Sequence, residues 1–330
     1  MGNGGEQHVD GVGAVPAAVL ERLRCPTCGK GVTALPDGVE CGSGHRFDRR
    51  NGVLDFSRAS TLTGSTERTF ASFGYEWNAF DDVRDEDAGF ADVYFRDVDL
   101  ESLSGKVGLD AGCGKGRYTR FLAAHLGTEV ALDGSSAAEA AARNLSGFDG
   151  VAVVRADLRD APFAPESFDF ISSLGVLHHL DDPFAGFERL LTFLAPKGQI
   201  LLYLYSRPAE RNLRSIALSC SAAFRKVTTR LSHPVLKAVS TPIAGFLYGA
   251  VVVPGEWGAA HGVSALAGLP MDAYRGKPFR SLVLDTFDRL SAPVEFRYTW
   301  PELQPWFDRT GLVVDAARDE TGWFVLAHRP

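Results

Sequence analysis

The sequence predicts an α/β protein with a Rossmann-like, doubly wound parallel sheet, a small N-terminal module and an inserted helical cap. Three observations lead to this prediction. Short apolar segments alternate with helical patterns from Lys106 onwards, which is typical of a parallel sheet with helices on both faces. Cysteines cluster near the N-terminus, and basic, amphipathic helical patterns interrupt the alternation over about 207–282.

The strand-like segments of the α/β region are short and apolar. Five come before the interruption, at 107–110, 129–133, 151–157, 168–174 and 199–205. Helices are expected between them at 117–125, 136–144 and 184–194, and the chain returns with a helix at 300–311 and strands at 312–319 and 323–329. In such a sheet, ligands bind beyond the carboxyl ends of the strands.

The chain divides into four parts on this reading. A glycine-rich flexible tail (1–20) precedes a compact cysteine-rich module (21–57). A linker with N-terminal helices (58–105) leads to the α/β domain (106–330), which carries the cap. The aromatic stretch at 70–80 is expected to be ordered, either covering the site or packing the linker onto the core.

Composition excludes several function classes. The chain has 330 residues and a net charge of −7, whereas nucleic-acid binders usually carry a basic surface, so nucleic acid is an unlikely partner. Residues 206–289 nevertheless carry +6, which leaves −13 for the rest. We expect a cytoplasmic protein, because the N-terminal residues lack a signal-peptide pattern. We expect no membrane span, because the apolar stretch Ile243–Val253, bounded by two prolines, has about half the ~20 residues required.

The first strand of the α/β region ends at Asp110 and leads into the turn AGCGKG, residues 111–116. Glycines allow a sharp turn and a close approach of the backbone to a ligand. A dinucleotide-binding turn would require a further glycine at 117, where Arg117 stands. An acid at this strand end suits a cationic ligand with an ammonium group and a sulfonium. The turn residues predicted to contact it are Gly112, Cys113, Gly114 and Gly116.

Acidic residues also close the second and third strands. Asp133, followed by Gly134, can accept bonds from both ribose hydroxyls, and such charge-assisted bonds contribute roughly 1.5–3 kcal/mol each. Asp157, with the backbone of Leu158, is placed to meet the amino edge of an adenine. Three acids at successive strand ends therefore predict a cationic ligand that carries adenosine.

The segments DAGCGKG, ALDGS, RADLRDAPFAPESFDFISSLGVLHHLDDP and LAPKGQILLYLY resemble class I S-adenosylmethionine-dependent methyltransferases of the methyltransferase-11 type. The resemblance covers about 106–205. It implies that the glycine turn holds the methionine end of the cofactor, that Asp133 holds the ribose, and that Asp157 faces the adenine. Asp110 would support the turn, and the stretch Leu174–His179 would lie near the reacting methyl group.

Two histidines in that stretch are candidates for a general base. His178 and His179 could accept the proton that an oxygen or nitrogen acceptor loses, and His179 is the better candidate. The alternative is that the pair only shapes the loop after the fourth strand.

The N-terminal cysteines have the spacing Cys25-x2-Cys28-x12-Cys41-x3-His45. Four nitrogen and sulfur ligands match the closed tetrahedral set of a structural zinc ion. The segment RCPTCGKGVTALPDGVECGSGHRFDRRNGVLDF is similar to the N-terminal zinc module of ribosomal RNA guanine-N1 methyltransferases. That similarity implies RNA as a rival substrate, against which the negative net charge argues.

These observations predict a methyltransferase that modifies an oxygen or nitrogen of a small molecule, in natural-product biosynthesis. The alternatives are an rRNA guanine-N1 methyltransferase, a C-methyltransferase of a quinone or polyketide, and a zinc adaptor without activity. Basic residues in the cap indicate an anionic or carrier-bound acceptor, or else a solvated helix face: Arg207, Arg211, Arg214, Arg225, Lys226 and Arg230. The stretch 285–300 is expected to be a loop that forms an acceptor wall.

Overall fold

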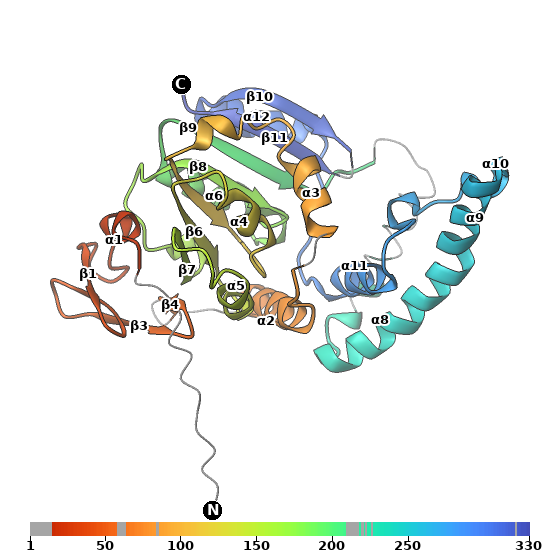
Figure 1. Cartoon of the computed structure of the whole chain (residues 1–330), viewed down its shortest axis with the longest axis horizontal. Coiled ribbons are helices and arrows are strands. Elements are labelled where there is room, and N and C mark those ends of the chain that lie inside the picture. Colours follow the sequence, from red (N-terminus) through yellow and green to blue (C-terminus); the bar gives the residue numbers. More distant parts are fainter. Residues whose placement is uncertain are drawn as a thin grey trace, which may run out of the picture. The chain divides into compact units, whose positions relative to one another are not determined.

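A computed structural model gives the fold, and it describes residues 15–57, 64–83, 86–208, 218, 221, 223–225, 227–320 and 322–330. The chain divides into two compact units (Figure 1), of which the first comprises 1–207 with 296–330 and the second comprises 208–295. Most of the predicted tail, part of the linker and three of the basic cap residues (Arg211, Arg214 and Lys226) lie outside the described residues.

The first unit is built on a mixed sheet whose order is β1-β2-β3-β4-β7-β6-β5-β8-β9-β11-β10. Its centre, from β4 to β9, is parallel, and both flanks are antiparallel. The strands are β1 (Val32–Leu35), β2 (Gly38–Cys41), β3 (Arg46–Arg50), β4 (Val53–Asp55), β5 (Val107–Ala111), β6 (Thr128–Asp133), β7 (Val151–Arg155), β8 (Phe168–Leu174), β9 (Leu194–Leu204), β10 (Val313–Asp319) and β11 (Trp323–His328). The predicted doubly wound α/β fold is confirmed.

Helices cover both faces of this sheet, as the strand sequences require. On β9, Ile200 and Leu202 pack into one core, whereas Leu201 and Tyr203 pack into the other, because successive side chains of a strand point to opposite faces. The first core includes residues of α1 (Ala17–Arg22), α6 (Pro183–Phe193) and α12 (Trp300–Thr310). The second face packs against α3 (Glu86–Tyr94), α4 (Arg117–Leu122) and α5 (Ala137–Asn144).

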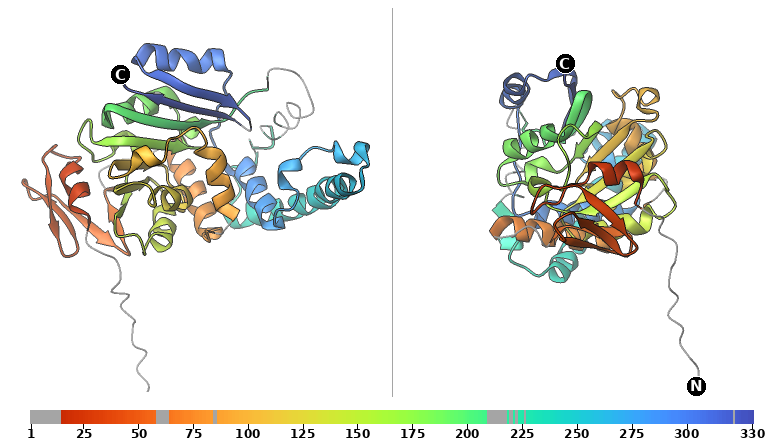
Figure 2. Two further views of the ribbon diagram at one scale, coloured as in Figure 1. Left: turned by 45° about the horizontal axis from the view of Figure 1, so that its top comes forward. Right: turned by 90° about the vertical axis from the view of Figure 1, so that its left-hand side faces the viewer.

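The cysteine-rich module extends the main sheet (Figure 2). Its last strand, β4, pairs in parallel with β7 through Val53 opposite Val153, and Phe56 is buried in the core. Helix α1 begins at Ala17, inside the segment taken from the sequence as a tail, and Val19 is fully buried. The module therefore shares its core with the α/β domain.

Residues 64–79, partly assigned to the linker from the sequence, form helix α2 (Gly64–Ala79). The predicted strands and helices after it are present, with ends that differ by at most five residues. Sequence signals explain some of these ends. Asp182 caps α6 by accepting a hydrogen bond from the Ala185 amide at 3.0 Å, and Gly311 ends α12 in the left-handed region at φ 71°.

The second unit is helical within the described residues. It contains α8 (His233–Leu247), a π-helical turn (Tyr248–Val252), α9 (Val253–His261), α10 (Ser264–Ala267) and α11 (Phe279–Ser291). Part of the predicted loop at 285–300 is therefore the end of α11. The separate unit runs from 208 to 295, thirteen residues beyond the predicted end of the cap.

The apolar stretch Ile243–Val253 does not end at its flanking prolines. Pro242 lies inside α8, and Pro254 lies in the first turn of α9. Together with the π-helical turn, α8 and α9 form one helix over His233–His261, which is long and apolar enough to cross a membrane by length and composition alone. The helix continues through Pro254 because this residue follows the π-helical turn. Proline has no amide hydrogen to donate, and the changed hydrogen-bond pattern of that turn accommodates the missing bond.

Candidate functional site

A cleft of about 880 Å³, including the space at its mouth, lies in the first unit beside the carboxyl ends of β5, β6 and β7. It is the place where a doubly wound sheet binds ligands. Most of the predicted cofactor residues, and one of the two histidines, line it: Gly112, Cys113, Gly114, Asp133, Gly134, Asp157, Leu158, Leu174 and His179.

The glycine turn after β5 forms one wall of the cleft. Gly112 has a φ of 89°, and a Cβ there would lie 2.2 Å from a methyl carbon of Val176. Only glycine fits this position, because the conformation and the contact both exclude a side chain. A Cβ on Gly114 would lie 3.0 Å from the indole nitrogen of Trp77, so an aromatic ring packs closely against the turn.

Two predicted residues of this region lie below the cleft. Asp110 is 2% exposed and accepts hydrogen bonds from the Thr119 hydroxyl at 2.6 Å and from the Ser172 hydroxyl at 3.2 Å. Burial raises the pKa of Asp110 to about 6. Gly116 precedes α4, and a Cβ there would lie 2.9 Å from the Leu145 side chain. Both residues can support the turn from beneath, but neither lines the cleft.

Asp133 closes β6 and is bound on both oxygens. One oxygen accepts the Gly114 amide hydrogen at 3.0 Å, and the other accepts the amide and hydroxyl hydrogens of Ser135 at 2.8 and 2.6 Å. Burial raises the pKa of Asp133 above its ordinary value, although these bonds oppose the shift. The carboxylate is thus fixed at the cleft, and Oδ2, which accepts only the Gly114 bond among the described residues, can accept a further hydrogen bond from a ligand.

Asp157, which follows β7, has a partner that the sequence analysis missed. Its carboxylate is 3% exposed and accepts bonds from the Arg159 side chain at 2.5, 3.0 and 3.2 Å. The Arg159 amide also donates to it at 2.9 Å. These bonds hold the tight turn that brings Leu158 to the cleft wall.

Helix α2 closes the cleft on one side with aromatic side chains. Phe70, Phe73 and Trp77 all line it, and their spacing of three and four residues places them on one face of the helix. The Phe70 ring would lie 2.4 Å from a Cβ on Gly134. Of the two interpretations of the aromatic stretch, the one that places it at the site agrees with the structure.

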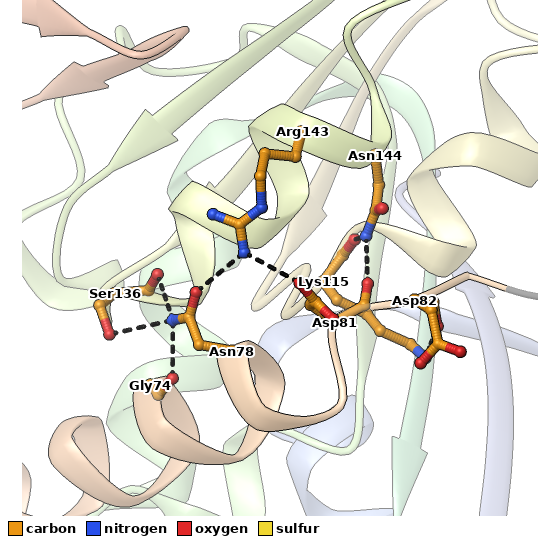
Figure 3. A network of polar contacts seen from close by, with 8 residues as sticks. All are labelled: Gly74, Asn78, Asp81, Asp82, Lys115, Ser136, Arg143 and Asn144. Carbon is orange, nitrogen blue, oxygen red and sulfur yellow. Dashed lines mark hydrogen bonds and ion pairs between the residues drawn. The ribbon is translucent and has the colours of Figure 1, made fainter.

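Polar contacts attach α2 to α5 and to the glycine turn (Figure 3). The Asn78 amide donates to the Ser136 carbonyl at 3.0 Å, and Arg143 donates to the Asn78 side-chain oxygen at 3.1 Å. At the end of α2, Asn144 donates to the carbonyls of Asp81 and Lys115, at 2.7 and 2.8 Å. The aromatic wall is therefore held in register with the turn that it covers.

The two histidines after β8 occupy different environments. His179 lines the cleft, with its ring centroid 4.9 Å from that of Phe73. His178 does not line it; it is fully buried, and neither ring nitrogen has a hydrogen-bond partner among the described residues. Its ring centroid lies 4.0 Å from that of Tyr205, and the Arg297 guanidinium lies 4.7 Å from the Tyr205 ring. Burial holds the pKa of His178 well below its ordinary value.

The four predicted metal ligands come together in the N-terminal module. The donor atoms of Cys25, Cys28, Cys41 and His45 all lie within 4.8 Å of one another. The Cys28 and Cys41 sulfurs are 3.6 Å apart, and the His45 Nδ1 lies 3.4 Å from the sulfurs of Cys25 and Cys41. Tetrahedral zinc with its usual bond lengths of about 2.0–2.3 Å requires donor separations of about 3.6–3.8 Å. The cluster therefore fits one zinc ion.

Two basic residues expected to attract an anionic acceptor are already paired. Arg225 binds Glu295 through two contacts, one of them 3.0 Å long, and the pair is largely buried. Arg207 binds Glu302 at 2.9 Å. Their charges are offset within the protein, which weakens the prediction of an anionic acceptor.

Comparison with known proteins agrees with this site. Residues 109–202 match the methyltransferase domain family. The chain contains a methyltransferase domain. The matched region includes the strand ends, the glycine turn and the two histidines, whereas α2, the metal cluster and the second unit lie outside it.

Three curated relatives share parts of this region. A demethylmenaquinone methyltransferase of Clavibacter sepedonicus is 36% identical over 107 residues, covering 32% of this chain and 44% of the relative. A tRNA U34 carboxymethyltransferase of Methylococcus capsulatus is 33% identical over 151 residues, covering 44% and 46%. A ubiquinone biosynthesis O-methyltransferase of Pseudomonas putida is 30% identical over 118 residues, covering 35% and 51%. The chain spans between about a quarter and a half of the length of the curated relatives it matches.

Several cleft residues were missed by the sequence analysis. They belong to α2, the glycine turn, α4 and the segment after β6: Thr69, Phe70, Lys115, Arg117, Tyr118 and Ser135. For Phe70 a signal was present, because it continues the helical spacing of Phe73 and Trp77 towards the N-terminus.

Proposed function

We propose that this protein is an S-adenosylmethionine-dependent methyltransferase that transfers a methyl group to an oxygen or nitrogen of a small molecule, in natural-product biosynthesis. The observation that carries the proposal is the fixed carboxylate of Asp133 beside the glycine turn, at the cleft of a methyltransferase domain. A cationic, ribose-bearing cofactor requires such an acceptor of hydrogen bonds.

The cleft residues fit this cofactor. Gly112 and Gly114 present only backbone to the cleft, because Val176 and Trp77 occupy the places that a Cβ would take, and Cys113 lies between them. Asp133 and Gly134 would hold the ribose, while Asp157 and Leu158 would border the adenine. Leu174, at the end of β8, would lie beside the reacting end. When bound, S-adenosylmethionine supplies a methyl group activated by its sulfonium centre, so the chain itself contributes mainly positioning and desolvation.

We assign the role of general base to His179. It is the histidine of the pair that lines the cleft, and it would take the proton that an oxygen or nitrogen acceptor loses. His178 would act indirectly: its buried, uncharged ring supports the loop that carries His179.

A second candidate function is C-methylation of a quinone. It is favoured by the 36% identity to a demethylmenaquinone methyltransferase over the matched region, and by the apolar character of the His233–His261 helix. The two candidates predict different bonds to the transferred methyl group. Hydriodic acid releases a methyl group from oxygen and leaves a C-methyl group in place.

The experiment is incubation of the protein with methyl-labelled cofactor and cell extract, followed by separation of the RNA and small-molecule fractions. We expect label in the small-molecule fraction, released by hydriodic acid in the case of an O-methyl product. The variant Asp133→Ala is the matched control and should leave both fractions unlabelled. Label confined to RNA would contradict the proposal, and label that resists hydriodic acid even at the higher temperatures that release N-methyl groups would favour C-methylation.

We further propose a structural zinc ion at Cys25, Cys28, Cys41 and His45. Four protein ligands leave no position for a substrate, and the ion would hold together the ends of short strands that cannot bury a core alone. Metal analysis should give one zinc per chain. The Cys28→Ser variant should lose the ion and unfold at a lower temperature, whereas Cys113→Ser, outside the cluster, should keep it. A metal-free protein of unchanged stability would contradict this assignment.

A further inference from the structure

The second unit carries an exposed stripe of large apolar side chains along α8 and α9, which Figure 1 draws as one continuous rod. The stripe consists of Val235, Val239, Ile243, Phe246, Val253 and Trp257, with exposed fractions from 38% to 74%. Steps of three or four residues place Val235, Val239, Ile243 and Phe246 along one side of α8, and Val253 and Trp257 continue the exposed apolar surface on α9 after the π-helical turn. We call this set the apolar stripe.

The neighbouring side of α8 is occupied within the same unit. Leu236, Ser240 and Ala244 are buried, and α8 packs along α11. This buried series is offset from the stripe by one residue, or about 100° around the helix. The stripe is therefore the apolar surface that remains after the unit has formed its own core.

The composition of this helix is unusual for a solvent-facing element. An 18-residue window of His233–His261 has a mean hydropathy of 1.6, yet only 22% of it is buried. A helix that spans a bilayer must face lipid or other apolar groups all round. Here α11 lies along it with the charged residues Arg280, Asp285 and Asp288, so the helix fits a position in the plane of an interface rather than across it.

The net charge of the second unit indicates which kind of partner the apolar stripe contacts. Residues 208–295 contain ten Lys and Arg and six Asp and Glu, a net charge of +4, while the rest of the chain carries −11. A second copy docked on the stripe would bring another positive unit against the first. An anionic bilayer is attracted to a positive unit and also accepts apolar side chains below its headgroups.

We propose that the apolar stripe docks the protein onto an anionic lipid bilayer. Helices α8 and α9 lie in the plane of the membrane, with Ile243, Phe246 and Trp257 below the headgroups. The basic excess of the unit adds electrostatic attraction. This docking does not depend on the proposed methyl transfer, because it involves neither the cleft nor the cofactor.

The test is flotation of the full-length protein with vesicles of phosphatidylcholine, with and without about 30 mol% phosphatidylglycerol. We expect the protein to float with the anionic vesicles, less with neutral ones, and less in about 0.5 M salt. Phe246→Glu should reduce the bound fraction at least about tenfold, because a carboxylate would enter the apolar layer. Val313→Glu introduces the same charge at an exposed valine of β10 and should bind as the native protein does.

Three results would overturn the proposal. The first is the absence of native protein from the floated fraction, and the second is equal flotation of Phe246→Glu and Val313→Glu. The third is a native dimer that Phe246→Glu converts to a monomer while vesicles bind neither form, which would identify a second copy as the occupant. Phe246→Ser and thermal unfolding of each variant separate loss of binding from loss of folding.

Discussion

The carboxyl edge of the sheet has two halves that differ in the charge of their buried side chains. Beside β6 and β7, Asp133 and Asp157 are buried carboxylates, and each accepts several hydrogen bonds. Beside β8 and β9, His178 is buried with no hydrogen-bond partner among the described residues, and its neighbours are aromatic. One edge of the sheet thus carries hydrogen-bonded carboxylates on one side and a buried imidazole without a hydrogen-bond partner among the described residues on the other.

The largest expected effect comes from removing the charge on the first half. Asp133→Ala should weaken binding of S-adenosylmethionine about 100-fold, since it removes a charge-assisted hydrogen bond worth roughly 1.5–3 kcal/mol and also the bond that fixes the Gly114 amide. Isothermal titration calorimetry measures the dissociation constant. Asp149→Ala, at an exposed loop position, is the control and should bind normally. Equal affinity in both variants would remove the electrostatic basis of the comparison.

A change beside β8 and β9 is expected to lower the rate by a similar factor without an effect on cofactor affinity. His179→Gln should lower kcat about 100-fold, which is typical of a lost general base. Its rate should no longer show the pH-dependent rise of the native enzyme. His125→Gln, in the turn that follows α4 and beside Phe121, is the matched control. Full turnover of His179→Gln at every pH would show that the histidine only shapes the loop.

A smaller effect is expected from the aromatic wall that spans the two halves. Trp77→Ala should weaken cofactor binding about tenfold, because it removes an apolar contact worth roughly 1.5–3 kcal/mol from the glycine turn. Trp77→Phe should retain most of the affinity. Calorimetry under the conditions used for Asp133→Ala gives dissociation constants that can be compared directly. A larger loss of affinity in Trp77→Ala than in Asp133→Ala would contradict the expected order of the two effects.

The smallest effect concerns stability and its dependence on pH. The folded protein holds the pKa of His178 below the ordinary value of 6.5, so below that pH the unfolded chain binds a proton that the folded protein does not. Folding stability is therefore lost as pH falls below 6.5. His178→Leu should remove this contribution and raise the free energy of unfolding by about 1–3 kcal/mol, since it also removes buried nitrogens without partners.

Thermal unfolding at pH 8 and at pH 5.5 provides the measurement. Other groups also titrate over this range, so the informative quantity is the difference between native protein and variant at each pH. His261→Leu, at an exposed position, is the control. A His178→Leu variant less stable than the native protein at both values would indicate that the imidazole is hydrogen bonded.

Sequence reasoning succeeded where the signal is local. Alternating apolar segments located β5 to β11, and strand-end acids located Asp133 at the cleft. It could not anticipate that Asp157 is bound by Arg159, two residues further on, because rotamer choice decides that contact. It favoured His179 over His178 as the base, but it could not anticipate that one step along the turn moves a side chain from the core to the cleft.

Long-range pairing accounts for the other differences. Strand β4 has three residues, and its partner Val153 lies a hundred residues away, so no periodic pattern reveals the pairing. The prolines at 242 and 254 bounded the apolar stretch in the sequence, but the helix runs through both of them, and a π-helical turn directly precedes Pro254. Tertiary structure thus overrides signals that are valid for an isolated segment.

The parallel pairing of β4 with β7 has a consequence for how the chain can be cut. Removing the N-terminal 57 residues would leave β7 as a bare edge, with unpaired amides open to the edges of other molecules. It would also expose the pocket that Leu54 and Phe56 fill. A catalytic fragment made by deleting the cysteine-rich segment should therefore aggregate. The α/β domain needs the N-terminal segment to cover the edge of β7.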